Sequence, residues 1–203
     1  PVLVGHNGLF HPTFEDAVKR VQRGEIGEPL FATAKSLQWL HFKDWDFRLS
    51  RQSTGGGTWV DCAGHLLYRL QPVFGEIETI SGEISHRARN EMEGEDTAMA
   101  TLRYRDGGIA QVVVSYDREL PGHERDWPNG CEQSLHIHGT QGTLEYSICP
   151  IPGVRIYSEA NGGTGGEWKS REDSDPFDFS FERQMAHFLD CAHRKADPRV
   201  PPR

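Results

Sequence analysis

Asp61 and His65 are the residues of this chain whose types and spacing best suit catalysis. They follow the glycines at 55–57 and lie in a run from Trp59 to Phe74 whose apolar residues recur every three or four positions. This spacing predicts a helix, on which residues four apart share one face. A carboxylate beside an imidazole fixes its tautomer and raises its basicity, so the pair could act as a general base. The alternative is a surface pair that stabilises the helix by only about 0.3 kcal/mol.

Four short blocks, in order along the chain, carry a resemblance to a known family. The glycines with Asp61 and His65 resemble the GGG…D…GH signature in the C-terminal domain of the glucose–fructose oxidoreductase / inositol dehydrogenase (Gfo/Idh/MocA) family. The segment VGHNGLFHP resembles the stretch that crosses from the family's nucleotide domain into its substrate domain, although Leu9 stands where many members carry an arginine. That departure argues against a substrate contact centred on Leu9. The other blocks are GEIG at Gly24 to Gly27 and IHGTQGTL at Ile137 to Leu144.

The resemblance implies an NAD(P)-dependent oxidoreductase that acts on a sugar, inositol or related polyol by hydride transfer. It implies that His65 is the base or acid, and that Asp61 orients it or binds substrate. NAD or NADP would be bound mainly by a domain missing from this chain. No strand followed by G-x-G-x-x-G occurs here, and the family's lysine-bearing EKP motif is also absent. The resemblance further implies a homo-oligomer assembled through a sheet face.

The segment His41 to Gln52 precedes the glycines and mixes aromatic residues with basic ones. Aromatic faces and charged donors suit a polyol pocket. Equally, the segment could be a surface loop whose aromatic residues cover the core. We predict substrate contacts from Trp45 and Arg48 in this segment, and from Asn7 in the crossing segment.

Composition limits the classes of function. The formal charge of -8 argues against a nucleic-acid partner, which needs clustered lysine and arginine. No run of about 18 apolar residues and no signal-peptide pattern occurs, so no membrane partner is expected. We expect free thiols rather than a disulfide frame or a zinc site, and hence a reducing, cytoplasmic location, because no C-x-x-C motif joins the cysteines. The cysteines are Cys62, Cys131, Cys149 and Cys191.

Strand patterns dominate from Glu76 to Ser158, and helical patterns lie on both sides of this stretch. They predict an α+β fold, a largely antiparallel open β-sheet with the helices packed on one face. The fold would form a single substrate-binding and oligomerisation domain over residues 1–203. Both ends look cut, and we expect a fragment without its N-terminal dinucleotide-binding (Rossmann) domain. The segments expected outside that stretch are a strand at Pro1 to Val4, a helix at Thr13 to Arg23, a strand at Leu30 to Leu40 and a helix at Phe177 to Lys195.

Several further features have two interpretations. Ile109 and Val113 give their strand a second apolar face, which would serve self-association. The apolar stripe of the last helix is expected to be core. His136 and His138 have the spacing of a metal pair, but without an evident third ligand we expect exposed histidines and no metal. The polar stretch 117–130 is expected to be a lid or interface loop, and NGGTGG at 161–166 a flexible tip rather than a dinucleotide loop.

Two hypotheses of different class follow. The first is the substrate-binding and catalytic-residue domain of an oxidoreductase, inactive without its cofactor domain. The second is a non-catalytic binding or oligomerisation module that uses its open sheet face.

Overall fold

The computed structural model describes residues 2–117, 131–149, 153–159, 169–172, 178–193 and 196–200. Within them, eight strands form one open sheet in the order β2-β3-β4-β1-β5-β6-β7-β8. The pair β1 and β4 is parallel, and the other neighbouring pairs are antiparallel. The strands are β1 (Pro29–Gln38), β2 (Ile77–Ser85), β3 (Thr97–Tyr104), β4 (Ile109–Ser115), β5 (Cys131–Gly139), β6 (Gly142–Cys149), β7 (Gly153–Ser158) and β8 (Lys169–Glu172).

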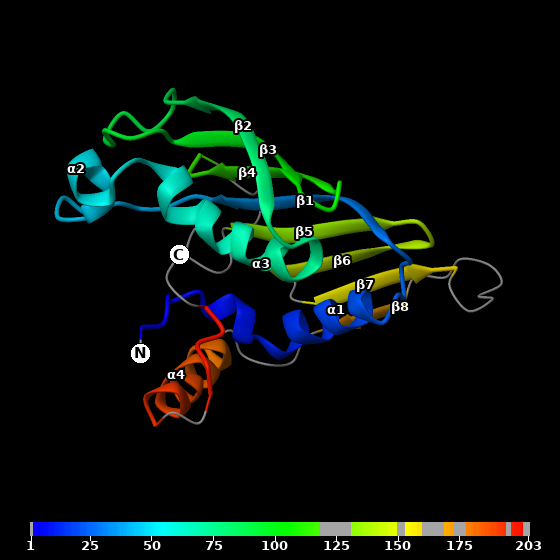
Figure 1. Ribbon diagram of the computed structural model, residues 1–203. Coiled ribbons are helices and arrows are strands. Elements are labelled where there is room, and N and C mark those ends of the chain that lie inside the picture. Colours follow the sequence, from blue (N-terminus) through cyan, green and yellow to red (C-terminus); the bar gives the residue numbers. More distant parts are fainter. Residues whose placement is uncertain are drawn as a thin grey trace.

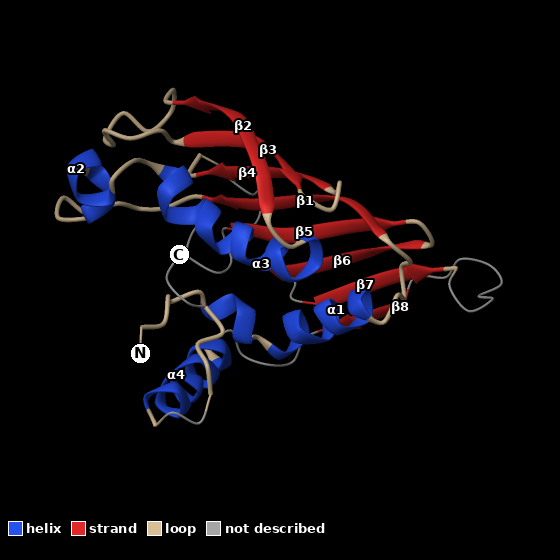
Figure 2. Cartoon of the chain, in the orientation of Figure 1, coloured by secondary structure: helices blue, strands red, loops and turns tan. Residues whose placement is uncertain are grey.

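The helices α1 and α3 run across one face of this sheet (Figures 1 and 2). Ala32 and Ala34 of β1 are buried under that layer, whereas Phe31 points to the other face and is 42% exposed. The predicted α+β class, with its largely antiparallel open sheet and one helical face, is therefore confirmed. The helical elements are η1 (Asn7–Phe10), α1 (Pro12–Gln22), η2 (Phe47–Leu49), α2 (Arg51–Thr54), the π-helical turn η3 (Trp59–Ala63), α3 (Gly64–Phe74) and α4 (Phe179–Ala192).

The glycine turn between α2 and η3 serves close packing of backbones. Gly55 ends α2 with φ of 80°, a left-handed conformation that favours glycine. Gly57 lies against the backbone of Glu95, where a Cβ atom would clash with the carbonyl oxygen and the amide nitrogen. The Thr58 amide donates to the same carbonyl at 2.9 Å. This turn therefore fixes the start of the π-helical turn that carries Asp61.

Two sequence expectations about the chain's covalent and strand structure are wrong. Residues 2–4 form no strand, and the Val4 amide instead donates to the Val200 carbonyl at 3.0 Å. Cys131 and Cys149 form a disulfide, because the antiparallel hairpin of β5 and β6 brings their Cα atoms to 6.0 Å. Only Cys62 and Cys191 are free thiols in the described part of the chain.

The last helix also departs from expectation. The stripe predicted to be core is exposed on α4, by 50% at Phe181, 58% at Met185 and 51% at Leu189. The physical reason is position: α4 packs beside η1 and away from the sheet, as Figure 1 shows. Asn7 joins the two elements by donating its amide to the Ser180 hydroxyl at 2.8 Å.

Four other expectations remain, and two of them fall on residues that the structure does not describe. Residues 118–130 of the lid predicted at 117–130, and the glycine tip at 161–166, lie outside the described residues. Among those that are described, no helix is long and apolar enough to cross a membrane. In the same residues, no group of three or more His, Cys, Asp and Glu side chains is arranged to hold a metal ion.

Candidate active site

A cavity of about 390 Å³ opens where η1, η2, η3 and α3 meet the sheet. It brings together four of the five residues expected to form a site, namely Asn7, Arg48, Asp61 and His65. The fifth, Trp45, is 84% exposed and is not part of the lining. The other lining residues are Ser36, Gln38, Leu40, Cys62, Arg69, Gln133 and Phe181.

Asp61 is held by two donors. Arg48 Nε donates to Asp61 Oδ2 at 2.7 Å, and the hydroxyl of the fully buried Tyr116 donates to the same oxygen. Asp46, which precedes η2, accepts from the Arg48 amide at 3.0 Å and from Arg48 Nη1 at 3.3 Å. Both contacts to Asp61 use Oδ2, so Oδ1 has no partner among the described residues and can accept from a hydroxyl group.

The protonation states of this group follow from its contacts. Burial acts to lower the pKa of Arg48, but the hydrogen bond and the charge of Asp61 outweigh it and the pKa stands raised. Burial, together with the nearby Cys62 and Asp61, raises the pKa of Tyr116, which therefore stays a protonated donor. The three side chains form a matched set of one cation, one anion and one neutral hydroxyl.

The spacing of Asp61 and His65 does not produce the expected contact, because Trp59–Ala63 is a π-helical turn. In a π turn the backbone bonds run from residue i to i+5, so residues four apart no longer stack as in an α-helix. Asp61 turns toward η2 and β4, where it meets Arg48 and Tyr116. The His65 ring instead meets His6, with 3.4 Å between their Nδ1 atoms.

His65 is a neutral imidazole at pH 7. Burial lowers its pKa to about 4, the positive charges of Arg69 and His6 act in the same direction, and Asp61 opposes them. The His6 ring, which packs edge-on against His65 and lies 4.2 Å from the Tyr68 ring centroid, fixes the orientation of His65. With Nδ1 engaged by His6, Nε2 has no hydrogen-bond partner in the part of the chain that is described. A neutral imidazole with one open nitrogen can take a proton from a substrate hydroxyl.

Arg69 is the buried cation of this cavity. Its side chain is 4% exposed, and Nη1 donates to Gln133 Oε1 at 3.2 Å. Nε is buried without any hydrogen-bond partner, and no carboxylate of the described residues pairs with the guanidinium. Burial lowers the pKa of Arg69, an effect that Tyr146 opposes.

The sequence analysis missed Arg69, His6 and Tyr116. Arg69 follows His65 by four residues in a regular helix, so the spacing rule that selected Asp61 also selects it. His6 is adjacent to Asn7 in the crossing segment. Tyr116 continues the buried alternation of β4, which the sequence marked only as apolar. All three residues could have been selected from the sequence, but they lie in largely apolar segments that indicate core.

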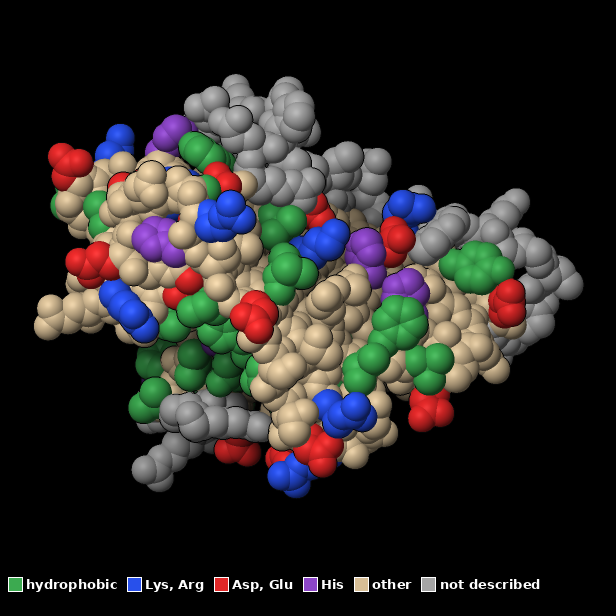
Figure 3. Space-filling model, turned by 90° about the horizontal axis from the view of Figure 1, so that it is seen from above, with side chains coloured by type: hydrophobic (Ala, Val, Ile, Leu, Met, Phe, Trp, Pro, Cys, Tyr) green, Lys and Arg blue, Asp and Glu red, His purple; other side chains and the backbone are tan. Residues whose placement is uncertain are grey.

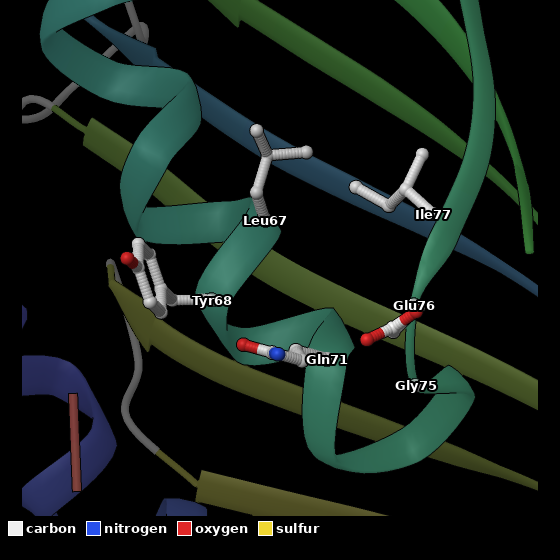
Figure 4. Close-up of a pocket in the computed structure, with 6 residues that line it drawn as sticks. All are labelled: Leu67, Tyr68, Gln71, Gly75, Glu76 and Ile77. Carbon is white, nitrogen blue, oxygen red and sulfur yellow. The ribbon is translucent and has the colours of Figure 1, made fainter. Parts of the chain in front are cut away.

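A second cavity of about 300 Å³ is lined by residues of α3 and of the start of β2 (Figure 4). Its lining is Leu67, Tyr68, Gln71, Gly75, Glu76 and Ile77. Among the described residues, Glu76 supplies its one carboxylate, and no imidazole or thiol lines it. The first cavity therefore contains the groups suited to proton transfer.

The sheet face opposite the helices carries exposed apolar side chains. Ile109 is 43% exposed, Met99 45%, and Val113 is partly exposed in register with Met99. Phe31 lies opposite Ile109 in the parallel pair and stacks on His138 with 4.4 Å between ring centroids. Figure 3 shows one side of the molecule with hydrophobic and histidine side chains exposed between charged ones.

A dinucleotide does not fit the residues described. None of the described helices begins at a glycine-rich turn that directly follows a strand, which is the seat that a pyrophosphate needs. The cavity instead offers an imidazole, a carboxylate and an amide, which suit the hydroxyl groups of a substrate.

Comparisons with known proteins identify the family of this chain. A family model described as GFO/IDH/MocA C-terminal domain matches residues 14–145. The 1,5-anhydro-D-fructose reductase of Ensifer adhaerens is 30% identical over 141 residues, which are 68% of this chain and 38% of that protein. The match therefore covers well under half the length of this curated relative.

Solved structures share the fold at low sequence identity. Levoglucosan dehydrogenase in complex with NADH and levoglucosan matches with a TM-score of 0.70 and 17% identity, covering 86% of this chain and 48% of that one. An oxidoreductase from Agrobacterium radiobacter, in complex with NAD⁺, L-tartaric acid and magnesium, matches with a TM-score of 0.78 and 21% identity. That match covers 98% of this chain and 57% of the other.

Proposed function

Because the chain belongs to the family of GFO/IDH/MocA C-terminal domains, we propose that it is the substrate-binding and catalytic-residue domain of an NAD(P)-dependent oxidoreductase. The proposed substrate is a sugar, inositol or related polyol. The observation that carries the proposal is the single cavity in which Asn7, Arg48, Asp61 and His65 converge from four separate elements.

The proposed proton acceptor is Nε2 of His65. Burial keeps the imidazole neutral, and the contact with His6 fixes the ring by its other nitrogen. In the tautomer in which His65 Nδ1 donates to His6, the open Nε2 carries no proton and is able to take the hydroxyl proton as the alcohol becomes a carbonyl. The low pKa lets the proton leave again readily, which returns the base for the next turnover.

Asp61 and Asn7 are the proposed hydroxyl ligands. Asp61 Oδ1 is open, whereas Oδ2 is held by Arg48 and Tyr116, so the carboxylate is oriented before substrate arrives. The Asn7 amide nitrogen donates to Ser180, which leaves its carbonyl oxygen as an acceptor. Arg48 acts on the substrate through the position of Asp61 and through its remaining nitrogen, Nη2.

The cofactor is proposed to bind mainly to a part of the protein outside this chain. The match covers 38% of the Ensifer relative, and it covers 48% and 57% of two solved structures whose complexes contain NADH and NAD⁺. When bound, the nicotinamide accepts the hydride that leaves the substrate carbon. By itself, the present chain is proposed to be inactive.

The test is a substrate screen of the intact protein that carries this chain. Sugars, inositols and other polyols are offered with NAD⁺ or NADP⁺, and NAD(P)H absorbance is followed. At least one polyol should be oxidised, and Asp61→Asn should lower kcat/KM for it. A folded protein that binds NAD(P) but oxidises no member of a broad panel would refute the function.

Self-association through the open sheet face is proposed as a separate property. The exposed patch of Phe31, Met99, Ile109 and Val113 is the surface that a second copy would cover. Light scattering should give a multimeric mass for the wild type and a lower one for Ile109→Lys. A monomer over a wide concentration range would count against it.

A cytoplasmic location stays part of the proposal, because NAD(P)-linked oxidation requires the intracellular cofactor pool. The argument from free thiols no longer supports it, since Cys131 and Cys149 form a disulfide. Cell fractionation decides the point.

A further inference from the structure

Arg69 is an unusual group to find in a substrate cavity. Arg69 is only 4% exposed, and an arginine keeps its proton at any working pH. Buried charges in proteins are paired or hydrogen-bonded, because removing a lone charge from water is costly. Among the described residues, the amide oxygen of Gln133 is the only hydrogen-bond acceptor for this guanidinium, and the buried Nε has no partner.

The fold holds this guanidinium in place from two sides. Gly8 of η1 packs directly against it, and a Cβ atom at that position would clash with Nη2. On the other side Gln133 of β5 is itself fixed, because its amide donates to the Ser36 hydroxyl at 3.2 Å. Ser36, Arg69 and Gln133 all line the cavity. The cation is thus positioned and partly unsatisfied at the wall of the cavity.

We propose that Arg69 binds the carboxylate of an acidic substrate, so that the preferred substrates are sugar acids rather than neutral polyols. A guanidinium presents two parallel N–H donors that match the two oxygens of a carboxylate. Anion binding would supply the charge and the acceptors that the protein itself leaves out.

The position of His65 agrees with this substrate class. His65 and Arg69 lie four residues apart on the regular helix α3, so their Cβ atoms are about 5–6 Å apart. A five- or six-carbon sugar acid is long enough to place its carboxylate at Arg69 and a distant hydroxyl at His65. The volume of about 390 Å³ suits a molecule of that size.

This inference rests on the proposed function for the identity of the reaction, but the binding site can be tested without turnover. Calorimetry on the intact protein compares gluconate, glucuronate and galacturonate with glucitol, glucose and galactose, and with inorganic phosphate as a separate anion. The acids should bind at least about 10-fold more tightly than their neutral counterparts, the usual weight of a charged hydrogen bond.

Two variants and one control locate the effect. Arg69→Gln should abolish the tighter binding of the acids relative to their neutral counterparts. Gly8→Ala displaces the guanidinium while keeping its charge, and it should weaken the preference for acids. Arg105→Gln removes an exposed arginine that pairs with Glu76, and should change nothing. Thermal melting checks that each variant is folded, and if Arg69→Gln does not fold, Gly8→Ala and the wild-type panel decide.

The outcomes separate the two proposals. Acids that bind through Arg69 without any NAD(P)-linked oxidation would support the subsite and refute the proposed reaction. Oxidation of neutral polyols with no preference for acids would keep the reaction and overturn the subsite. Tighter binding of phosphate than of any sugar acid would overturn the assignment to a carboxylate.

Discussion

Arg48 and Arg69 line the same cavity and have opposite surroundings. Arg48 meets the carboxylates of Asp46 and Asp61, and its side chain remains 30% exposed. Arg69 is almost fully buried, and among the described residues its guanidinium hydrogen-bonds only to the Gln133 amide. The two histidines beside Arg69 have lowered pKa values, from burial first and then from the arginine's charge. We refer to these as the matched end, around Asp61, and the unmatched end, around Arg69.

The difference indicates which end of the cavity has its charges paired within the protein and which end has a charge left for a ligand to pair. At the matched end, hydrogen bonds within the protein satisfy the charges, so the side chains are oriented in advance. At the unmatched end, burial is tolerated although it lowers stability, and such groups concentrate at functional sites. Substitutions should therefore affect activity and stability differently at the two ends.

The largest effect should come from His65 at the unmatched end. In the intact protein, His65→Ala should cut turnover by about 10²- to 10⁴-fold, the weight of general acid–base catalysis. Cofactor binding should be nearly unchanged. Steady-state kinetics and NAD(P) titration measure both quantities. A folded His65→Ala protein with full activity would remove His65 from the mechanism.

The same residue should make the protein sensitive to acid. Its folded-state pKa of about 4 lies below the ordinary 6.5, so above pH 6.5 both states are neutral and no difference arises. As the pH falls from 6.5 to 4, the unfolded chain binds a proton that the folded chain refuses. Stability should therefore drop by up to about 3 kcal/mol across this window.

Urea unfolding at a series of pH values measures this drop. His65→Gln should flatten the profile between pH 6.5 and 4, and above pH 7 the two curves should run parallel. His6, whose pKa is also lowered by burial, contributes in the same direction and leaves some slope in the variant. Equal slopes in wild type and variant would show that His65 is not buried as a neutral ring.

Arg69→Met tests the unmatched end through the free energy of unfolding. Replacing a buried, poorly matched charge with an apolar chain of similar length is neutral or stabilising by about 1–3 kcal/mol. Activity toward the true substrate should fall at the same time. Denaturant midpoints and kcat/KM test the two halves together. A loss of more than about 2 kcal/mol would mean that the guanidinium is satisfied by contacts in the folded protein.

Asp61→Asn should lower the free energy of unfolding, whereas Arg69→Met should leave it unchanged or raise it. It leaves Arg48 without its main charge partner and weakens the acceptor for Tyr116, at a cost of about 1–2 kcal/mol for a pair that is partly exposed. A double-mutant cycle with Arg48→Met isolates the coupling. Its value should exceed that of the exposed pair Arg105–Glu76, which serves as the matched reference.

The sequence predicted the fold class, and four of the five site residues expected from it line the cavity, because periodicity and glycine turns are local signals. It could not predict which side chains touch. The π-helical turn at Trp59–Ala63 redirects Asp61 away from His65, and no residue pattern marks that turn. The disulfide depends on where Cys131 and Cys149 fall in the register of β5 against β6, which no local residue pattern indicates.

The exposed stripe on α4 shows a different limit. Apolar periodicity indicates that Phe181, Met185 and Leu189 share a face, but not that this chain supplies the surface that covers it. Arg69 was passed over for a related reason, since a lone arginine in an apolar helix is usually read as a solvent-exposed residue.

The smallest effect should come from Trp45, which the sequence placed among the substrate contacts. Its side chain is 84% exposed and lies outside the cavity lining, whereas Arg48, three residues later, is part of it. Trp45→Ala should change the free energy of unfolding by less than about 0.5 kcal/mol, as is usual for exposed positions. In the intact protein it should leave KM for the polyol unchanged. Arg48→Met is the paired variant, and it should raise KM because it frees Asp61 from its fixed orientation. If Trp45→Ala raised KM as much as Arg48→Met does, the loop 41–52 would have to close over the substrate. In that case the substrate site at the matched end would include residues of this loop that do not line the cavity in the ligand-free structure.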